Sequence, residues 1–340
     1  MDKLFLITNE SVFNYEGKFY CDNIDLKSTP EGLNKKFQIY LIARDSKIKR
    51  SHKINLNHIN IYKNLISFLI GIFRTFRDNN SKYLVVSITP FTFFACLLIK
   101  LFKKKIIVYL RSDGYEEYKS ILGLFGPAMY HFMFSIIAKI CPLISCRKHI
   151  LRGRKGSVVS PSQLNSNWFL NHTKPDLTKT NLLYVGRIKV EKGIFSLIEI
   201  LKNENENFFL SIVGAEKNSK IKIKQDNISI HKIENNEQNL INFYDQHNIF
   251  VLPSFTEGHP MALLESLARR RPVIIFKEIE HVIDGKKGIF VAERSAKSFF
   301  EKVNFIRQNY VSIQDNMKDN HLPTKEKFLK EISELILNID

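Results

Sequence analysis

The chain alternates short buried strands with longer helical stretches, and this pattern limits the fold more than any other feature. Strands are predicted where β-branched and aromatic residues cluster in short runs. In the first half these runs cover 3–8, 37–43, 57–62, 83–88, 105–110 and 156–160. Helical patterns lie between several of them, over 64–77, 91–104 and 115–140. Buried strands that alternate with helices form a parallel sheet covered on both faces, so we expect an α/β fold.

A second series of the same kind follows after residue 180. Its strands are expected over 181–185, 208–213, 228–231, 249–252, 272–276 and 288–291. Its helices are expected over about 193–202, 236–246, 261–270 and 295–308. With 340 residues the chain exceeds the roughly 250–300 residues that a single core supports. The sequence therefore predicts two doubly wound, Rossmann-like domains.

The boundaries follow from local composition. Residues 1–165 are predicted to form the first domain and 181–322 the second. The polar stretch 166–180 lacks a sustained period and contains a proline, so it is predicted to be a linker. Residues 323–340 have helical periodicity and are expected to form a helix, which has the option of packing back across the boundary. Ligands of open parallel sheets bind beyond the carboxyl ends of the strands, so we expect a cleft between two facing domains.

The first segment with chemical content follows the strand expected at 181–185. Gly186 permits close approach of a ligand to the backbone. Arg187 and Lys192 come next, before a helix that opens near Gly193. A planar guanidinium and a mobile ammonium at a strand end are suited to binding a diphosphate. The alternative is that both are solvated loop side chains.

The second segment follows the strand expected at 249–252. Glu257 and Gly258 lie in the loop, Pro260 is suited to the first turn of a helix, and Glu265 follows on that helix. Free N–H groups at the helix start favour an anionic or hydroxyl-rich ligand. Two carboxylates in this pattern are able to accept hydrogen bonds from separate sets of hydroxyls. The alternative for Glu265 is a surface carboxylate paired with Arg269 at i+4.

These residues, over roughly 181–291, resemble the retaining glycosyltransferases of family 4. The resemblance implies a GT-B fold, in which two Rossmann-like domains face each other across a cleft and the C-terminal domain holds a nucleotide sugar. It implies that Arg187 and Lys192 neutralise the donor diphosphate, that Glu257 binds the donor sugar and that Glu265 binds the ribose. Further donor-binding residues implied in this way are Gly186, Gly214, Gly258, His259, Pro260 and Met261.

The resemblance also implies a chemistry. Cleavage of a glycosyl–phosphate bond leaves negative charge on the departing diphosphate, and fixed cations at that place lower the barrier. Arg187, Lys192, Glu257 and the helix terminus are thus the expected catalytic groups, in a hexosyltransferase-type reaction that retains the anomeric configuration. The resemblance implies that no metal is needed, and the sequence has no Asp-x-Asp pattern that would argue otherwise. We therefore expect no cofactor, only a UDP-, GDP- or ADP-sugar donor.

The N-terminal domain is expected to bind the acceptor, and here the sequence departs from the family. Many relatives have a Gly-Gly pair in the first strand–helix loop, whereas this chain has only Gly17 followed by Lys18. Relatives often place a His after a later strand, whereas here the strand at 105–110 leads to Arg111 and Asp113. Gly17, Lys18, Arg111 and Asp113 are therefore the candidate acceptor-side residues. An ordinary turn at Asp113, with Arg111 paired to it, is the alternative.

The net charge of the chain limits the classes of partner that we expect. The net charge is +17, of which residues 1–150 carry 23 basic minus 11 acidic side chains, or +12. Such a field attracts polyanions, but no zinc-finger, RRM-like or GxxG pattern accompanies it, so we expect no nucleic acid. Basic clusters at 103–105 and 147–155 flank an apolar stretch and favour an anionic membrane surface, while solvated clusters around a core helix pair are the alternative.

We therefore expect a cytoplasmic enzyme, peripheral on the inner face of the cytoplasmic membrane. Its four scattered cysteines fit a reducing compartment, no signal peptide is recognised, and no transmembrane helix is expected. The expected acceptor is a glycan or lipid-linked glycan of bacterial surface polysaccharide: lipopolysaccharide, O-antigen or capsule. The competing functions are a GT-B nucleotide-sugar epimerase, a phosphorylase and a catalytically silent sugar-nucleotide or glycan-binding protein.

Overall fold

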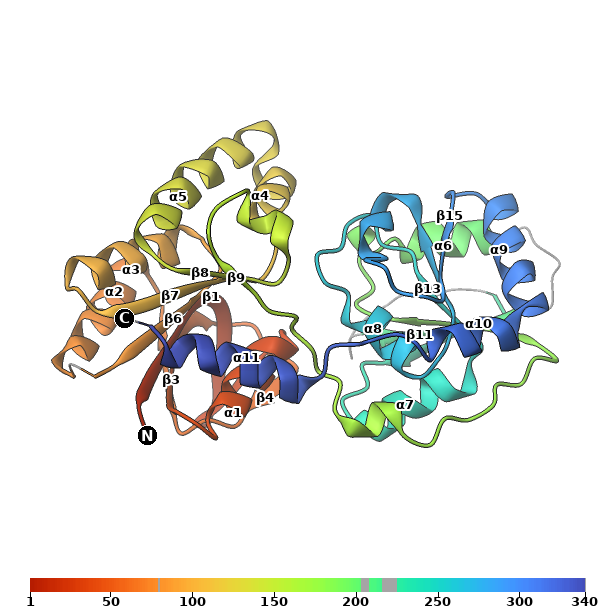
Figure 1. Cartoon of the computed structure of the whole chain (residues 1–340), viewed down its shortest axis with the longest axis horizontal. Helices are drawn as coiled ribbons and strands as arrows, with labels where there is room; N and C mark the ends of the chain where they lie inside the picture. The colour runs from red at the N-terminus through yellow and green to blue at the C-terminus, as the bar shows by residue number, and fades with distance from the viewer. Residues whose placement is uncertain (79, 203–207, 216–224, 340) are drawn as a thin grey trace. The chain divides into compact units, whose positions relative to one another are not determined.

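The structure is a computed structural model that describes residues 1–78, 80–202, 208–215 and 225–339. The chain divides into two compact units, which are described separately below (Figure 1). Unit 1 comprises Met1–Gln163 with Lys325–Asp340, and unit 2 comprises Leu164–Thr324. Each unit contains its own β-sheet and its own buried apolar core. The predicted fold of two Rossmann-like α/β domains is confirmed.

Unit 1 is built on a mostly parallel sheet. Its parallel strands run in the order β5-β3-β1-β6-β7-β8-β9. Two short strands, β2 and β4, pair antiparallel at the end of β1. The strands are β1 Lys3–Tyr15, β2 Lys18–Cys21, β3 Gln38–Ser46, β4 His52–Ile54, β5 His58–Tyr62, β6 Lys82–Val86, β7 Lys105–Leu110, β8 Leu143–Ser145 and β9 Ser157–Val158.

Helices cover both faces of this sheet. One core lies under α2, α3, α4 and α5, and a second lies under α1 and the C-terminal α11. The helices are α1 Ile24–Leu33, α2 Leu65–Arg74, α3 Pro90–Leu101, α4 Gly114–Leu122, α5 Gly126–Ile140 and α11 Lys325–Leu337. Reciprocal capping boxes start α2 at Asn64 and α3 at Thr89. The helix predicted in the C-terminal segment exists, and it packs in unit 1, where Lys82 Nζ donates to Leu337 O at 2.8 Å.

Three strands of unit 1 escape the sequence patterns because they are short: β2, β4 and β8. The turn between β1 and β2 consists of Glu16 and Gly17, whose φ angles are 50° and 74°. Positive φ at both central residues is typical of a tight hairpin turn. Gly17 thus serves a hairpin rather than the strand–helix loop that the family resemblance implies.

The apolar stretch Gly114–Ile140 has the length and hydropathy of a membrane-spanning helix, with 28% of its apolar window buried. The structure divides it into α4 and α5, because Gly123 adopts a φ of 63° and reverses the chain. The two helices pack on each other: a Cβ at Gly126 would collide with Tyr118 O, and the Tyr115 and Tyr130 rings lie 4.9 Å apart. The helical stretch predicted over 115–140 is therefore a pair of helices, as the alternative interpretation of the sequence had it.

Unit 2 has a six-stranded, fully parallel sheet in the order β12-β11-β10-β13-β14-β15. Its strands are β10 Thr180–Val185, β11 Phe208–Ala215, β12 Ile228–Lys232, β13 Ile249–Leu252, β14 Val273–Phe276 and β15 Ile289–Ala292. Its helices are α6 Ile194–Leu201, α7 Glu237–Gln246, α8 Met261–Ala268, α9 Ala296–Gln308 and α10 Tyr310–Met317. One apolar core joins the sheet to these helices.

Six short 3₁₀ helices complete the described elements. They are η1 Thr75–Arg77, η2 Gly123–Phe125, η3 Lys148–Leu151, η4 Ser166–Phe169, η5 Val190–Lys192 and η6 Lys277–Val282. Of these, η5 and η6 lie beside the residues that the sequence assigns to the donor.

Residues 166–180, for which the sequence predicts a linker, belong to unit 2. Trp168 is buried in its core, and two buried arginines at the end of α8 hold the segment by its carbonyl groups. Arg269 donates to Leu170 O at 2.6 Å and to Asn171 O at 2.9 Å, and Arg271 donates to Thr173 O at 3.0 Å. The carbonyl oxygens replace the water that these guanidinium groups lose on burial.

Candidate donor site and unit 1 pocket

The predicted donor-site residues of unit 2 lie where β10, β11 and β13 end. Gly186 follows β10 and Gly214 lies near the end of β11, the neighbouring strand. A Cβ at Gly214 would collide with Gly186 O, and one at Gly193 would collide with Pro253 O. Glycine at 214 and 193 therefore lets the loops after β10, β11 and β13 approach each other at the backbone.

Lys192 and Glu257 form an ion pair at this edge. Lys192 Nζ lies 2.7 Å from Glu257 Oε1, and the hydroxyl of Ser254 donates to the same oxygen at 2.7 Å. The Glu257 side chain is only 9% exposed, so its charge depends on these partners. Its backbone carbonyl is 2.8 Å from His281 Nε2. Two predicted catalytic groups are thus held together in the ligand-free protein.

Arg187 differs from Lys192 in its surroundings. It is exposed, and its side chain makes no hydrogen bond or ion pair with the part of the chain that the structure describes. Its backbone carbonyl accepts a hydrogen bond of 2.8 Å from Tyr184, which fixes the loop beneath it. A fixed loop with a mobile guanidinium is suited to an incoming anionic group.

The loop after β13 leads into α8, the helix that carries Glu265. Pro260 is the N-cap of α8 and provides no side-chain cap, so the N–H groups of the first turn lack that partner. A Cβ at Gly258 would meet nothing within 4 Å, so space is open there. The backbone N–H groups of Gly258, His259 and Met261, together with the positive end of α8, therefore lie where the sequence predicts the donor sugar, while Pro260 has no N–H to donate.

Glu265 makes a contact that the sequence does not predict. The Tyr244 hydroxyl donates to Glu265 Oε2 at 2.8 Å. Burial raises the pKa of Glu265 to about 7, more than the hydrogen bond from Tyr244 lowers it. The carboxyl therefore changes charge near neutral pH, and its second oxygen is open to another donor.

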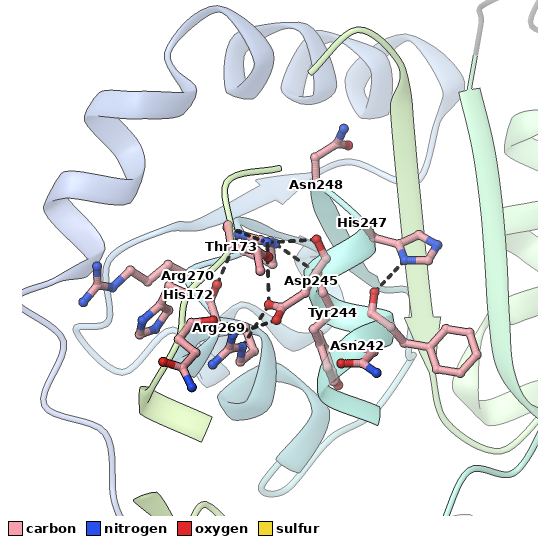
Figure 2. Close-up of polar contacts among 12 residues, drawn as sticks. His172, Thr173, Asn242, Tyr244, Asp245, His247, Asn248, Arg269 and Arg270 are labelled. Atoms are coloured by element: carbon pink, nitrogen blue, oxygen red, sulfur yellow. Dashed lines mark hydrogen bonds and ion pairs between the residues drawn. The ribbon is translucent and has the colours of Figure 1, made fainter. Parts of the chain in front are cut away.

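Arg269 does not pair with Glu265, which contradicts the alternative reading of that helix. Arg269 forms two parallel hydrogen bonds with Asp245 of α7, at 2.9 and 2.7 Å, as Figure 2 shows. Asp245 also lies 3.6 Å from Arg271. The two arginines are occupied at the far end of α8, so Glu265 has Tyr244 as its side-chain partner in the described structure.

Arg294 is a site residue that the sequence analysis missed. It follows β15, and its guanidinium carbon lies 4.0 Å from the Phe255 ring centre and 4.3 Å from that of Phe276. It donates to Pro253 O at 3.0 Å and pairs with Glu278 at 2.7 Å. Arg294 thus holds the loop that carries Ser254 and Glu257. Only the three-dimensional packing brings it there, since it lies 37 residues beyond Glu257.

Unit 1 has a separate polar pocket of about 260 Å³ near the ends of β1, β6 and β7. It is lined by Thr8, Asn9, Glu10, Ser11, Asp22, Arg50, Val86, Ser87, Thr89, Arg111, Ser112 and Glu117. Asn9 Oδ1 is buried and has no hydrogen-bond partner among the described residues. The pocket is lined mainly by polar side chains, with hydroxyls, carboxylates and guanidinium groups among them, a lining suited to a hydroxyl-rich ligand.

Of the four candidate acceptor-side residues, Arg111 alone lines this pocket. Its guanidinium faces Glu10 at 3.7 Å and Asp25 at 3.8 Å, distances beyond ordinary hydrogen-bond length. The alternative pairing of Arg111 with Asp113 is not found in the described structure. Asp113 instead caps α4 and binds Arg152 at 2.8 Å. Gly17 and Lys18 lie at the β1–β2 hairpin turn and do not line the pocket.

No group of three or more His, Cys, Asp or Glu side chains suited to a metal ion occurs among the residues that the structure describes. The four cysteines are all buried free thiols.

Comparison with known proteins agrees with this geometry. Residues 169–321 match the family model "Glycosyl transferases group 1". Over 131 residues the chain is 29% identical to the capsular polysaccharide biosynthesis glycosyltransferase CapM of Staphylococcus aureus, covering 35% of this chain and 34% of that protein. Over 92 residues it is 33% identical to the putative teichuronic acid biosynthesis glycosyltransferase TuaC of Bacillus subtilis, covering 27% and 23%. The matches thus span about a third or less of these relatives.

Solved structures share the whole fold at low identity. Anabaena Alr3699/HepE, crystallised with UDP and glucose, has a TM-score of 0.71 and 10% identity over 99% of this chain and 100% of that one. WaaG, a glycosyltransferase involved in lipopolysaccharide biosynthesis, has a TM-score of 0.65 and 11% identity over 98% and 100%. The protein therefore has the GT-B fold of glycosyltransferases. The family match of residues 169–321 falls within unit 2 of this fold.

Proposed function

We propose that the protein transfers a sugar from a nucleotide-diphosphate sugar to a glycan or lipid-linked glycan of a bacterial surface polysaccharide. The observation that carries this proposal is the gathering of Arg187, Lys192, Glu257 and Glu265 at one edge of the unit 2 sheet. The match of this region to a glycosyltransferase family, and the polysaccharide-related names of CapM, TuaC and WaaG, support it.

In this proposal Arg187 and Lys192 bind the donor diphosphate. Charge builds up on the diphosphate as the glycosyl bond breaks, and cations that are already fixed there stabilise it. The ion pair with Glu257 holds the Lys192 ammonium at one place before the donor arrives. Glu257 in turn accepts hydrogen bonds from the donor sugar, while Glu265 and the backbone at Gly186 and Gly214 bind the nucleoside.

The reaction is proposed to retain the anomeric configuration, without a metal or other cofactor. The departing phosphate would take the proton of the acceptor hydroxyl on the same face of the sugar, so no separate base is required. A hexosyl group is the proposed cargo. UDP-sugars are the first donors to test because HepE was crystallised with UDP, and GDP- and ADP-sugars stay in the panel.

The acceptor is proposed to bind the unit 1 pocket. Glu10 and Asp22 are suited to accept hydrogen bonds from sugar hydroxyls, and Arg111 is suited to donate to them. The protein is further proposed to work in the cytoplasm, peripherally bound to the inner face of the cytoplasmic membrane, where lipid-linked acceptors are anchored.

A thermal-shift and hydrolysis panel of UDP-, GDP- and ADP-sugars, run with a metal chelator, tests the proposal. A ligand at 100 times its Kd stabilises a protein by about 2.7 kcal/mol, which is a measurable rise in Tm. We expect one nucleotide class to stabilise the wild type, and Arg187→Ala and Glu265→Ala to abolish the shift. No shift with any nucleotide sugar would refute the donor site, and conversion of the donor to its epimer without acceptor would instead identify an epimerase.

A further inference from the structure

The α4–α5 hairpin of unit 1 exposes an unusual apolar tip, defined here as residues 121–125. Leu124 is 89% exposed and Phe125 is 85% exposed. Ile121 and Leu122 are also exposed, and on α5 Phe132 continues the apolar surface at 62% exposure. Isolated exposed apolar side chains are ordinary, but a contiguous group at a protruding turn marks an interaction surface.

The hairpin is rigid behind its tip. The rings of Tyr115, Tyr118 and Tyr130 pack together, with centres 4.9 and 5.4 Å from Tyr130. Gly126 brings α5 against the Tyr118 carbonyl, so no larger residue fits at that position. The close packing of the two helices keeps the tip from folding back onto the core. Its apolar side chains therefore stay in water unless another surface covers them.

Positive charge lies beside the hairpin. Residues 147–155 contain five Lys or Arg and no acidic residue. Within this segment Arg152 lies over the Tyr115 ring of α4, at 4.8 Å, and binds the helix-capping Asp113. Lys148, Arg154 and Lys155 are exposed. An apolar tip next to basic side chains matches a bilayer whose headgroups are anionic, since each basic group near such a surface contributes about 1 kcal/mol.

The same hairpin begins at the unit 1 pocket. Ser112 and Glu117 line the pocket, and the tip begins four residues after Glu117 on the same helix. At 1.5 Å per residue the helix covers about 6 Å over that distance. A bilayer that receives the tip would therefore lie close to the pocket.

We propose that residues 121–125 insert into an anionic lipid bilayer, with 147–155 on the headgroups, and thereby present the unit 1 pocket to a lipid-anchored acceptor. The last clause rests on the proposed function, whereas the insertion does not. The alternative to a bilayer is a second copy of the chain that packs on the tip, and the test below distinguishes the two.

Flotation of the full chain with vesicles tests the insertion. Phosphatidylcholine vesicles that contain about 30% phosphatidylglycerol are compared with vesicles of phosphatidylcholine alone. We expect binding to the anionic vesicles, and a loss of at least about tenfold in Leu124→Ser/Phe125→Ser, because two large apolar side chains no longer enter the bilayer. Lys148→Glu/Lys155→Glu should weaken binding and reduce its salt dependence. The matched control is Ile66→Ser/Leu101→Ser, two exposed apolar residues of α2 and α3 in the same unit.

A spectroscopic variant reports insertion directly. Trp168, the single native tryptophan, is buried in unit 2, so Phe125→Trp adds one exposed reporter. We expect a blue shift of its emission with anionic vesicles and quenching by brominated lipid. The proposal is overturned if the wild type does not bind, if the control variant loses binding as much as the tip variant, or if the tip variant changes only the oligomeric state in lipid-free buffer.

Nucleotide-sugar binding in lipid-free buffer separates this inference from the proposed function. The tip variants should keep the thermal shift of the wild type, because residues 121–125 lie in unit 1 and the donor residues in unit 2. A protein that binds vesicles but no nucleotide sugar would refute the proposed function and leave the surface standing. A protein that binds nucleotide sugars but no vesicles would refute the membrane surface and leave the proposed function standing.

Discussion

The two units share an architecture but differ in how their polar groups are arranged at the strand ends. In unit 2 the carboxylates meet specific partners: Glu257 binds Lys192 and Ser254, and Glu265 binds Tyr244. In unit 1 the pocket is mixed: Asp22 binds Arg50 and Glu10 accepts a hydrogen bond of 2.7 Å from Asn23, whereas Arg111 stays 3.7 and 3.8 Å from its acidic neighbours. The predicted donor carboxylates of unit 2 are thus held in place by close partners, whereas unit 1 leaves Arg111 and the buried Asn9 Oδ1 less tightly engaged among the described residues.

This difference has a physical reason. A nucleotide diphosphate is a fixed, highly charged ligand, and the groups that bind it gain from being held in place beforehand. An acceptor glycan varies more between enzymes and offers hydroxyls, which bind adaptable polar side chains. The proposed donor and acceptor roles predict that changes in unit 2 reduce turnover strongly and that changes in the unit 1 pocket alter acceptor use modestly.

The largest effect is expected for the Lys192–Glu257 pair. Lys192→Ala and Glu257→Ala should each lower kcat by about 10²–10³-fold, because each removes a group that the proposed function places beside the reacting bond and leaves its ion-pair partner without a counter-charge. The double variant should lose little more than either single one, since both act as one unit. Steady-state kinetics with the nucleotide sugar found in the panel measure this. Additive losses would show that the ion pair has no part in the reaction.

The next effect concerns Arg294, which supports the donor loop without lying in it. Arg294→Lys should lower kcat by about 10–100-fold, because a lysine does not replace the planar stack between Phe255 and Phe276 or the bond to Pro253 O. Binding of the free nucleotide should change less than turnover, since Arg187 and Glu265 stay in place. Isothermal titration with the nucleotide gives that comparison.

The matched control for Arg294 is Lys277→Ala, which breaks an exposed ion pair with Glu293, the residue next to Arg294. It should leave kcat within about twofold, as surface ion pairs contribute little. An equal loss in both variants would mean that the region responds to any change of charge, and that the loop contacts of Arg294 have no special role.

The sequence anticipates unit 2 better than unit 1 for reasons that particular residues show. Strand-end residues such as Arg187 and Glu257 follow directly from local patterns, because parallel strands bring their carboxyl ends to one edge. Arg269 and Arg294 carry no local pattern: their partners, Asp245 and Phe255, lie 24 and 39 residues away. Such long-range pairing depends on packing that one sequence does not reveal.

In unit 1 the failures have local causes. Glu16 and Gly17 form a two-residue hairpin turn in a place where the resemblance implies a ligand loop, and the following strand has only four residues. Gly123 divides a stretch that is apolar enough for one long helix. The alternation of strands and helices still predicts the sheet correctly, because it depends on burial over many residues rather than on single turns.

The pH response of Glu265 should have a moderate effect. Its pKa is raised to about 7 from 4.5, so the folded protein favours the neutral acid, and stability is present at low pH and lost as the pH rises from about 4.5 through 7. The ionised carboxylate is a stronger acceptor for ribose hydroxyls than the neutral acid, so nucleotide affinity should rise between pH 6 and 8. Glu265→Gln should remove both slopes and raise the ligand-free Tm by a few degrees at pH 8, about what 1–2 kcal/mol gives in a domain of this size.

Thermal unfolding and titration at pH 6, 7 and 8 measure both slopes, with Glu237→Gln as the control because Glu237 influences the pKa of the same carboxyl less than burial or Tyr244 does. An unchanged pH profile in Glu265→Gln would mean that another group controls nucleotide binding, and it would remove the ribose role assigned to Glu265.

The smallest effect is expected in unit 1 and compares two residues that the sequence placed together. Arg111→Ala should raise the acceptor KM by about tenfold, the loss of one or two hydrogen bonds to a charged donor, and leave donor hydrolysis unchanged. Gly17→Ala should leave both constants unchanged, because Gly17 does not line the pocket. It should instead lower stability by about 1 kcal/mol, because its φ of 74° is unfavourable for alanine. Kinetics with a varied acceptor, beside thermal unfolding of both variants, separate the two roles. A change of acceptor KM in Gly17→Ala with unchanged Tm would show that the acceptor binds at the β1–β2 turn and would refute the assignment of the acceptor to the pocket.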